Sequence, residues 1–195
     1  MKKLLISTLL LSALSFSAHA DFVKNQQLDS AAIAKYSAMN PTQLEPSAKV
    51  GDAAAQFYLG LRYKLGQGVA KNPTQAFNWF KKAADQGIKE AQLNVGQMYA
   101  SGEGVKQDIN SAKTYLMKSA KQGENKASYV LAMIEERSKN YANAYQWYDL
   151  STRDGMVDYR VKDLSEKKIV QLAANLSSND IRLARERADQ WIQAD

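Results

Sequence analysis

Residues of the same type recur every 36 positions in the central part of this chain. Gly51, Gly87 and Gly123 are separated by 36 residues (87 − 51 and 123 − 87). The same interval relates Gly60 to Gly96, Tyr63 to Tyr99, Gly66 to Gly102, Gly68 to Gly104, Val69 to Val105, and Ala76 to Ala112. A period of about 20 to 50 residues is typical of a solenoid, in which each small unit buries its apolar face against its neighbours. The sequence therefore predicts a stack of repeated units.

Each unit contains two helical patterns separated by a glycine-containing turn. In the first unit, the first helix is expected over about Asp52 to Leu65, because small and apolar residues recur along it at helical spacing. Asn72 is expected to cap a second helix with Pro73 at its first position, and Gly87 to end it. The two apolar faces consist of Ala55, Leu59, Gly60 and Tyr63, and of Ala76, Trp79, Phe80, Ala83 and Ala84.

Two glycines lie inside the first helices of their units. Glycine in a helix costs about 1 kcal/mol relative to alanine, so Gly60 and Gly96 require a compensating gain. Close approach of another helix supplies such a gain. We therefore expect the backbone of a partner helix to pack tightly against both glycines.

The third unit departs from the period at its turn. Ala127, Leu131 and Ala132 keep the 36-residue interval. The residues after the turn, such as Gly155, follow their counterparts by only 32 residues (155 − 123). Here Ser138-Lys139-Asn140 replaces the Gly-x-Gly-Val turn. Because a deletion in a loop leaves a stack intact, we expect the third unit to keep its two helices.

Glu135 occupies the position that Tyr63 and Tyr99 hold in the first two units. A carboxylate at a position that is normally buried requires an explanation. It is either relaxed into solvent by the shorter turn, paired with a base such as Arg137 or Arg160, or a functional acid. The sequence leaves these interpretations open.

The repeats predict three units at 51–87, 88–123 and 124–155. An N-terminal cap segment at 21–50 and C-terminal capping helices at 156–195 flank them. In the N-terminal segment, Ser30 to Met39 is predicted to form a short helix, after which Pro41 and Pro46 are expected to limit regular structure until Ala48. On the carboxyl side, one helix is predicted over about 161–176 and a final amphipathic helix from Ser177 onward.

The first twenty residues are typical of a secretory signal peptide. Lys2 and Lys3 precede an apolar run over 4–14, and Ala18-His19-Ala20 supplies the small residues of a cleavage site. This run is shorter than the roughly 18 residues that a spanning helix needs, so no membrane insertion is expected. We expect cleavage before Asp21 and a periplasmic location in a Gram-negative bacterium.

Removal of this segment limits the chemistry that remains. His19 is the only histidine, and the chain has no cysteine. The mature chain therefore lacks the residues of Ser-His-Asp and Cys-His catalysis, of imidazole or thiolate metal sites and of disulfides, and no cofactor or metal is expected. Cleavage removes two of the 26 basic residues and none of the 20 acidic residues. The formal net charge of the mature chain is therefore 24 − 20 = +4. These charges are interspersed, so no binding to nucleic acid is predicted.

Three strings resemble the Sel1-like repeat, a relative of the tetratricopeptide repeat. They are Ala55-Gln-Phe-Tyr-Leu-Gly-Leu-Arg-Tyr63, Gly66-Gln-Gly-Val69 and Ala76-Phe-Asn-Trp79-Phe-Lys-Lys-Ala-Ala84. The resemblance covers about Ala48 to Gly155, and Leu176 to Trp191 is similar to a closing helix. It implies an all-α fold, a right-handed α/α superhelical solenoid of helix pairs with a C-terminal capping pair, whose first helices line the concave face. It also implies protein binding.

The tetratricopeptide pattern implies which side chains of the first helices face a ligand. Carried over by phase, these are Phe57, Leu61 and Lys64 in the first unit, Glu90, Leu93 and Gln97 in the second, and Lys126, Tyr129, Met133 and Glu136 in the third, with Ala54 and Ala100 at the remaining positions. Apolar anchors with a charged border are typical of a protein-binding groove. In the alternative interpretation, Phe57, Leu93 and Tyr129 pack between adjacent units.

These features favour a non-enzymatic periplasmic binding protein, an adaptor or regulator whose partner is another envelope protein. One alternative is an immunity protein that neutralises a periplasm-directed secretion-system toxin. A second is a weak cell-wall-active or β-lactamase-like hydrolase, since Ser165-Glu-Lys-Lys168 fits a Ser-x-x-Lys motif. The companion Ser-Asp-Asn and Lys-Thr-Gly motifs are missing, and the segment is interpreted as a solvated helix. The oligomeric state is left open.

Overall fold

The computed structural model describes residues 28–153 and 158–193. Within these ranges the chain is helical and contains no strand. The helices are α2 (Ser30–Tyr36), α3 (Pro41–Lys49), α4 (Ala53–Leu65), α5 (Pro73–Asp85), α6 (Lys89–Ser101), α7 (Ile109–Lys121), α8 (Asn125–Arg137), α9 (Tyr141–Arg153), α10 (Tyr159–Ala173) and α11 (Ser178–Gln193). The predicted signal peptide and Gly155 lie outside the described residues.

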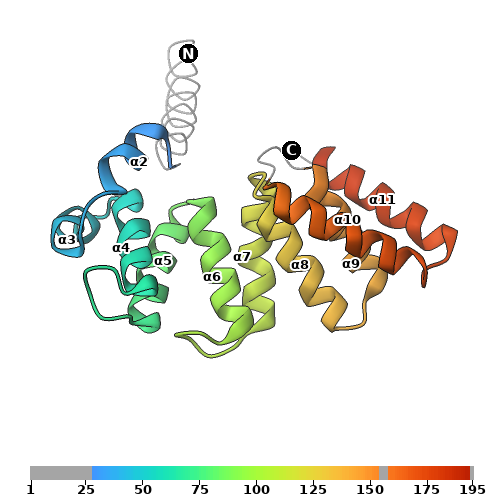
Figure 1. Ribbon diagram of the computed structural model, residues 1–195, viewed down its shortest axis with the longest axis horizontal. Helices are drawn as coiled ribbons and strands as arrows, with labels where there is room; N and C mark the ends of the chain where they lie inside the picture. The colour runs from blue at the N-terminus through green and yellow to red at the C-terminus, as the bar shows by residue number, and fades with distance from the viewer. Residues whose placement is uncertain (1–27, 154–157, 194–195) are drawn as a thin grey trace, which may run out of the picture.

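The helices follow one another as packed pairs along a curved array. In units 1, 2 and 3, α4 packs on α5, α6 on α7, and α8 on α9, and we call the two members of each pair the first and the second helix. Contacts of α5 with α6 and of α7 with α8 join the pairs. Figure 1 shows the array running from α2 at one end to α11 at the other. The predicted all-α solenoid of helix pairs is confirmed.

Local sequence signals begin and end the helices of the units. The carboxylate of Asp52 accepts a hydrogen bond from the backbone N–H of Ala55, and the side chain of Asn72 accepts one from the N–H of Gln75. Gly66 ends α4 with a φ of 71°, a left-handed conformation that glycine adopts without steric cost. First and second helices contain 13 residues each in all three units. The deletion in unit 3 therefore falls within the turn, as expected.

The prediction that Pro41 and Pro46 limit regular structure is wrong, because both lie in α3. Pro41 is its first residue, where a helix does not need the missing N–H. Asn40 and Gln43 form a capping box that stabilises this start. Pro46 removes one helical hydrogen bond, but the carbonyl that loses its donor belongs to Thr42, which is exposed to solvent. A proline at this place is therefore tolerated.

The two last helices close the array, and both pack on α9. Helix α10 also contacts α8 and so continues the layer of first helices. On α11, Ala184 and Ala188 are fully buried, and the ring of Trp191 lies 4.9 Å from that of Trp147. Helix α11 thus covers the apolar face of the last second helix, as a cap of a solenoid must.

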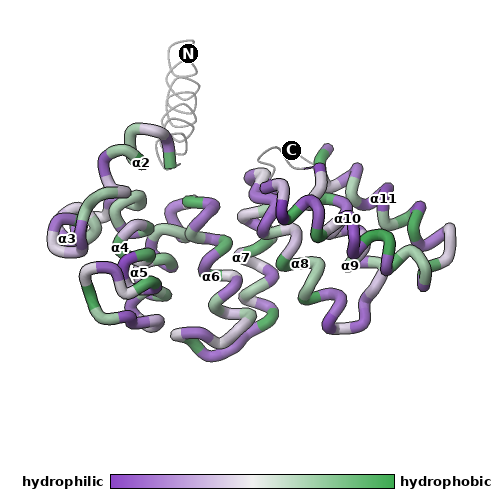
Figure 2. Tube along the Cα trace, viewed as in Figure 1, coloured by the Kyte–Doolittle hydropathy of each residue, from purple (hydrophilic) through white to green (hydrophobic). Residues whose placement is uncertain are grey.

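The core is continuous along the array, because each cluster of buried side chains spans neighbouring units. One cluster joins Leu44 of α3 to Leu59 of α4, and a second joins Phe80 of α5 to Val95 of α6. The largest extends from α6 to α11. Figure 2 shows the corresponding pattern, with apolar segments alternating with polar ones along each helix. Each unit therefore depends on its neighbours for burial.

A buried glutamine ties each first helix of units 1 and 2 to the helices on either side. In unit 2, Nε2 of Gln92 donates to the carbonyl oxygen of Ala84 in α5 over 3.2 Å, and its Oε1 accepts from Gln122 over 2.8 Å. In unit 1, Gln56 bonds in the same way to α3 and to Gln86. Both amides are satisfied despite their burial, so they link three helices at little cost.

The glycines inside the first helices receive side chains of the second helices. A Cβ at Gly60 would lie 2.7 Å from Cδ1 of Phe80, and one at Gly96 would lie 2.6 Å from Cγ of Leu116. The expected close approach is present at both places. At Gly60, however, a ring and not a backbone fills the space, whereas at Gly96 the carbonyl oxygen of Ala112 also lies 3.2 Å from the Cβ position.

Candidate protein-binding groove

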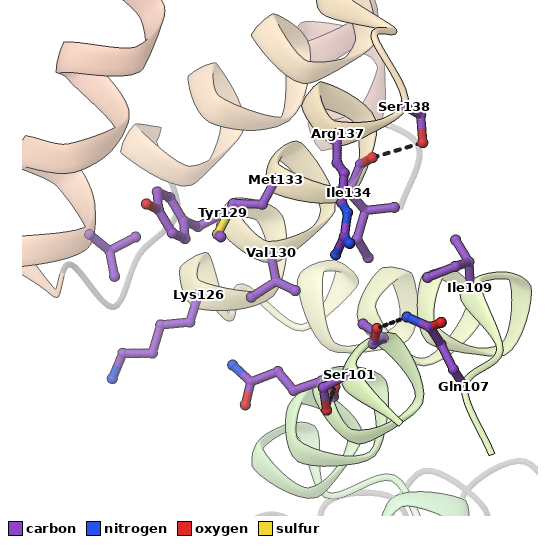
Figure 3. A pocket seen from close by; sticks show the side chains of 13 residues that line it. Ser101, Gln107, Ile109, Lys126, Tyr129, Val130, Met133, Ile134, Arg137 and Ser138 are labelled. Carbon is purple, nitrogen blue, oxygen red and sulfur yellow. Dashed lines mark hydrogen bonds between the residues drawn. The ribbon is translucent and has the colours of Figure 1, made fainter. Parts of the chain in front are cut away.

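A pocket of about 790 Å³ opens on the face formed by the first helices of units 2 and 3. The largest share of its lining comes from α8, and the rest comes from α6, the turns after α6 and α8, the start of α7, and α10. The apolar lining residues include Ile109, Tyr129, Val130, Met133, Ile134 and Val161. Figure 3 shows Tyr129, Val130 and Met133 along one helix, with Ile109 across the pocket from them. We call this cavity the Ile109 pocket.

The polar rim of the Ile109 pocket is positively charged. Two of the described residues that line it, Lys126 and Arg137, are basic, and none is acidic. The Lys126 ammonium lies 3.0 Å from the carboxylate of Asp158, which holds the pKa of Asp158 below its usual range. No described residue forms an ion pair or a hydrogen bond with the Arg137 side chain. Figure 3 shows this guanidinium beside Ile134, pointing into the cavity.

A smaller cavity of about 420 Å³ adjoins the first one and shares Tyr129, Met133 and Arg137 with it. Its wall contains Glu136, whose carboxylate accepts hydrogen bonds from the hydroxyl of Tyr148 and from the ammonium of Lys168, each over 2.7 Å. Burial alone would raise the pKa of Glu136, but these two donors outweigh it and hold the pKa below its usual range. The carboxylate is therefore ionised and neutralised within the wall.

The structure brings together the predicted residues of the later units. Five of them, Gln97, Ala100, Lys126, Tyr129 and Met133, line the Ile109 pocket. Glu136 lines the adjoining cavity. The predicted residues of unit 1 and the start of unit 2, which are Phe57, Leu61, Lys64, Glu90 and Leu93, line neither cavity.

Phe57 and Leu93 lie in the core, so they are not available as surface anchors. Their exposed fractions are 7% and 8%, and the Phe57 ring lies 5.8 Å from that of Phe80. The reason is helical geometry, because Phe57 and Gly60 are three residues apart (60 − 57) and share the face that receives Phe80. In unit 3, Ala132 replaces that glycine, and Tyr129 stays partly exposed at the pocket.

Polar contacts occupy the first-helix face of units 1 and 2. The ammonium of Lys64 donates to Oδ1 of Asn94 over 2.6 Å, which links α4 to α6. Burial lowers the pKa of Lys64 and raises that of Glu90. Leu61 is partly buried against the second cluster of the core. This part of the face is therefore already filled by contacts within the chain.

Glu135 is a structural residue in a buried ion pair. Its exposed fraction is 7%, and its carboxylate lies 2.6 Å from the ammonium of Lys113. It also accepts a hydrogen bond of 2.9 Å from Nδ2 of Asn140, in the shortened turn. The expectation of a paired carboxylate is confirmed, but the base is Lys113 of α7 and not Arg137 or Arg160. The acid thus fastens the short turn to the preceding unit.

Ser165 is fully buried, whereas Glu166 and Lys167 beside it are exposed, so the interpretation of this segment as a solvated helix holds for its charged residues but not for the serine. Its Oγ lies 2.6 Å from Oγ of Ser151, between α10 and α9. The ammonium of Lys168 forms an ion pair with the carboxylate of Glu136. A nucleophile must be reached by its substrate and be activated by a base. The arrangement of Ser165 and Lys168 provides neither, and it contradicts the hydrolase motif.

Sequence reasoning missed several residues of the Ile109 pocket. Ile109 in unit 2 is the counterpart of Pro73 in unit 1 (109 − 73 = 36). Arg137 is the last residue of α8, directly before the shortened turn. The signal for both is the deletion in the turn of unit 3, because a shorter turn leaves uncovered what a full-length turn would cover.

In the described part of the chain, no helix has both the length and the apolar character required to cross a membrane. Across the same residues, no cluster of three or more acidic, histidine or cysteine side chains is arranged to hold a metal ion.

Comparisons with known proteins agree with this architecture. Residues 53–88, 89–124 and 128–156 match the family model described as the Sel1 repeat. Among solved structures, a Sel1 repeat protein from Oxalobacter formigenes is 30% identical over 62% of this chain, with a TM-score of 0.50. A protective antigen of uropathogenic Escherichia coli strains, which displays an SLR fold, is 25% identical over 78% of this chain, with a TM-score of 0.56. The chain spans 56% and 40% of these two proteins, and no curated protein matches it.

Proposed function

The chain belongs to the Sel1 repeat family, and from this premise we propose that it is a non-enzymatic protein that binds another protein on its first-helix face. Sel1 repeat proteins are generally modules for protein interaction. The observation that carries the proposal is the Ile109 pocket, an apolar cavity with a basic rim on this face. Cavities of about 300 to 1,000 Å³ with apolar walls and a few polar groups are typical of ligand sites.

Large apolar side chains at this pocket remain accessible to solvent. The exposed fractions of Met133 and Ile109 are 49% and 38%. Methionine is adaptable and is common on surfaces that bind peptides, because its thioether side chain fills irregular gaps. Burial of such anchors by a partner supplies most of the free energy of a protein interface, while polar groups at the rim set its register.

The proposed place of action is the periplasm, where the chain would act as an adaptor or regulator of an envelope protein. This part of the proposal rests on the sequence of the first twenty residues, with its two lysines, apolar run and Ala18-His19-Ala20 site. The absence of cysteine is compatible with an oxidising compartment. Cell fractionation of the full chain tests it, and the mature form is expected to begin at Asp21.

The binding proposal is tested by cross-linking in the cell followed by mass spectrometry, with a Met133→Asp variant. Met133→Asp places a charge in the apolar wall and should abolish capture of the partner that the wild type retains. Val170→Asp is the matched control, because Val170 is 73% exposed on α10 and lines neither cavity. Equal thermal unfolding of both variants would confirm that the fold is kept. Capture by Met133→Asp at the wild-type level would contradict the proposal.

The finer role follows from the identity of the captured protein. A regulator or adaptor would retain an envelope protein of its own cell, whereas the immunity interpretation requires a toxin, whose gene is expected next to this one. Ser165→Ala addresses the hydrolase interpretation, and it should leave any hydrolysis of β-lactams or cell wall by the purified protein unchanged because the Ser165 side chain is buried.

A further inference from the structure

The turn of unit 1 lies against the start of α3, the helix that precedes this unit. The turn of unit 2 lies against the start of α5, the second helix of unit 1. A Cβ at Gly68 would be 3.0 Å from Cδ of Pro41, the first residue of α3. A Cβ at Gly104 would be only 2.3 Å from the carbonyl oxygen of Pro73, the first residue of α5. At Gly104, only glycine permits so close an approach of two backbones. In both units, the chain thus covers this place with its own turn.

The corresponding place in unit 3 is left uncovered. The step from the end of the first helix to the start of the second is 109 − 101 = 8 in unit 2 and 141 − 137 = 4 in unit 3. The residue that a full-length turn would cover is Ile109, the counterpart of Pro73. Pro41 is buried and Pro73 is half-buried, but Ile109 is 38% exposed and lines the pocket. The deletion has therefore removed the segment that would fill this end of the cavity.

The charge of the pocket restricts what can take the place of that segment. No acidic residue is among its described lining residues, and Arg137 has no described partner. Arg137 is exposed at the edge of the cavity, and a guanidinium there can bind a carboxylate through two parallel hydrogen bonds. In unit 2 the covering turn itself carries a carboxylate, Glu103, which lies 3.9 Å from the ammonium of Lys71. The apolar wall and the cation together fit a segment that carries both kinds of side chain.

We propose that the Ile109 pocket accepts a short segment of the partner protein in which an apolar side chain stands next to an aspartate or glutamate. The apolar side chain packs on Ile109 and Met133, and the carboxylate pairs with Arg137. The partner thereby replaces the turn that unit 3 lacks. This assignment rests on the proposed function and states which chemistry the partner must present.

The first test selects random heptapeptides displayed on phage against immobilised mature protein. Peptides with an acidic residue adjacent to a large apolar one should be enriched on the wild type. Arg137→Glu reverses the charge at the rim and should remove this enrichment and favour basic peptides. For a synthetic peptide of the wild-type consensus, Arg137→Glu should weaken binding by about tenfold or more, the usual effect of losing a charge-assisted hydrogen bond. Arg182→Glu, on the exposed side of α11, is the control and should select as the wild type does.

The second test restores the missing turn. Replacing Ser138-Lys139-Asn140 by the unit 2 turn, residues 102–108, should cover Ile109 and abolish peptide binding, while circular dichroism and thermal unfolding show an intact fold. A peptide that still binds this variant would overturn the proposal. So would peptides selected without acidic residues, or a selection that Arg137→Glu leaves unchanged.

The outcomes separate this inference from the proposed function. If the wild type captures an envelope protein that Met133→Asp loses, but the selected peptides carry no acidic residue, the binding function stands and the assigned chemistry fails. If Met133→Asp keeps the captured protein, the face itself is wrong. If the wild type self-associates in analytical ultracentrifugation and the variant with the longer turn is a monomer, the occupant is a second copy, and the proposed partner segment is excluded.

Discussion

Units 1 and 2 repeat one set of contacts, and unit 3 replaces that set with a different one. In the first two units, a buried glutamine links three helices, and a glycine of the turn lies against the preceding helix pair. In unit 3, Ser128 stands at the glutamine position, the turn is shorter, and the Glu135–Lys113 pair fastens it to α7. The polar links of units 1 and 2 are neutral and satisfied within the chain. Unit 3 instead combines a buried charge with an open apolar pocket.

This difference indicates that the stacking of the helices and the accessible apolar wall depend on different parts of the array. The helices keep the same length and the same pairing in all three units, so the backbone of the stack does not depend on which set of contacts is present. The accessible apolar wall, however, occurs where the repeated set is broken. Four variants would break or sharpen this comparison, and they follow from the largest expected effect to the smallest.

Gly104→Ala should be the most destabilising change. Gly104 has a φ of 72°, and its Cβ would lie 2.3 Å from a backbone oxygen, so the turn or α5 must move. We expect a loss of about 3 kcal/mol or more in the free energy of unfolding, measured by urea denaturation. Gly123→Ala is the matched control, because Gly123 has a φ of 74° and nothing within 4 Å of the Cβ position. It should lose only about 1 to 2 kcal/mol, and an equal loss in both variants would show that the turn contact is unimportant.

Lys113→Met should remove the link that is particular to unit 3. It leaves the buried carboxylate of Glu135 with only the hydrogen bond from Asn140. Breaking a buried ion pair costs about 3 to 5 kcal/mol, and since the Lys113 side chain is 32% exposed we expect about 2 kcal/mol. Differential scanning calorimetry measures the loss. The double variant Lys113→Met/Glu135→Gln should recover most of it, and failure to recover would mean that lost packing and not the unpaired charge is responsible.

Gln122→Ala should weaken unit 2 without affecting the pocket. It removes the donor to the buried Oε1 of Gln92 and a hydrogen bond of 3.0 Å to the carbonyl oxygen of Gly87. An unsatisfied buried acceptor costs about 1 to 3 kcal/mol, and we expect about 1.5 kcal/mol. Gln86→Ala makes the same change in unit 1 and should lose a similar amount in the same urea titration. Clearly unequal losses would show that the two units are not equivalent.

Glu136→Gln should have the smallest effect, and that effect should depend on pH. The folded-state pKa of Glu136 lies below its usual range, so its ionised form stabilises the fold above the unfolded pKa of about 4.3. That contribution is lost as the pH falls through the lower folded pKa. Because the pair with Lys168 is partly exposed, we expect a loss below about 1 kcal/mol at pH 7 that shrinks as the pH falls below the unfolded pKa. Urea titrations at pH 7 and at a series of acidic pH values check this, and a loss that is constant with pH would contradict it.

The sequence predicted the parts of the fold that depend on local chemistry. The helix cap at Asn72 and the glycine-containing turns could be predicted because each acts within a few residues of its own position. The period itself revealed the stacking. Helix α3 could not be predicted, because the cost of Pro46 depends on the surroundings of Thr42, a residue that the fold leaves exposed to solvent.

The candidate site was less accessible because it depends on contacts between units. The partner of Glu135 lies 22 residues earlier (135 − 113), on a helix of another unit, where no spacing rule applies. For Phe57 and Leu93, the phase of a related repeat implies a ligand-facing position, but the same helical spacing also allows packing between adjacent units, and the sequence leaves both interpretations open. The side chain that a helical glycine receives then decided their burial. The pocket arises from a missing segment, and a sequence shows what is missing only by comparison with its own other repeats.

The satisfied glutamines of the first helices have a consequence for how such an array can change over time. The hydrogen bonds of each amide reach only the helix before its own and the end of the helix after it, so these links couple only neighbouring parts of the array. A single short genetic deletion in one turn can then expose a new recognition surface while every other interface keeps its geometry. In an array of this kind, a new binding specificity can arise through the loss of residues from a turn, without the addition of a new loop.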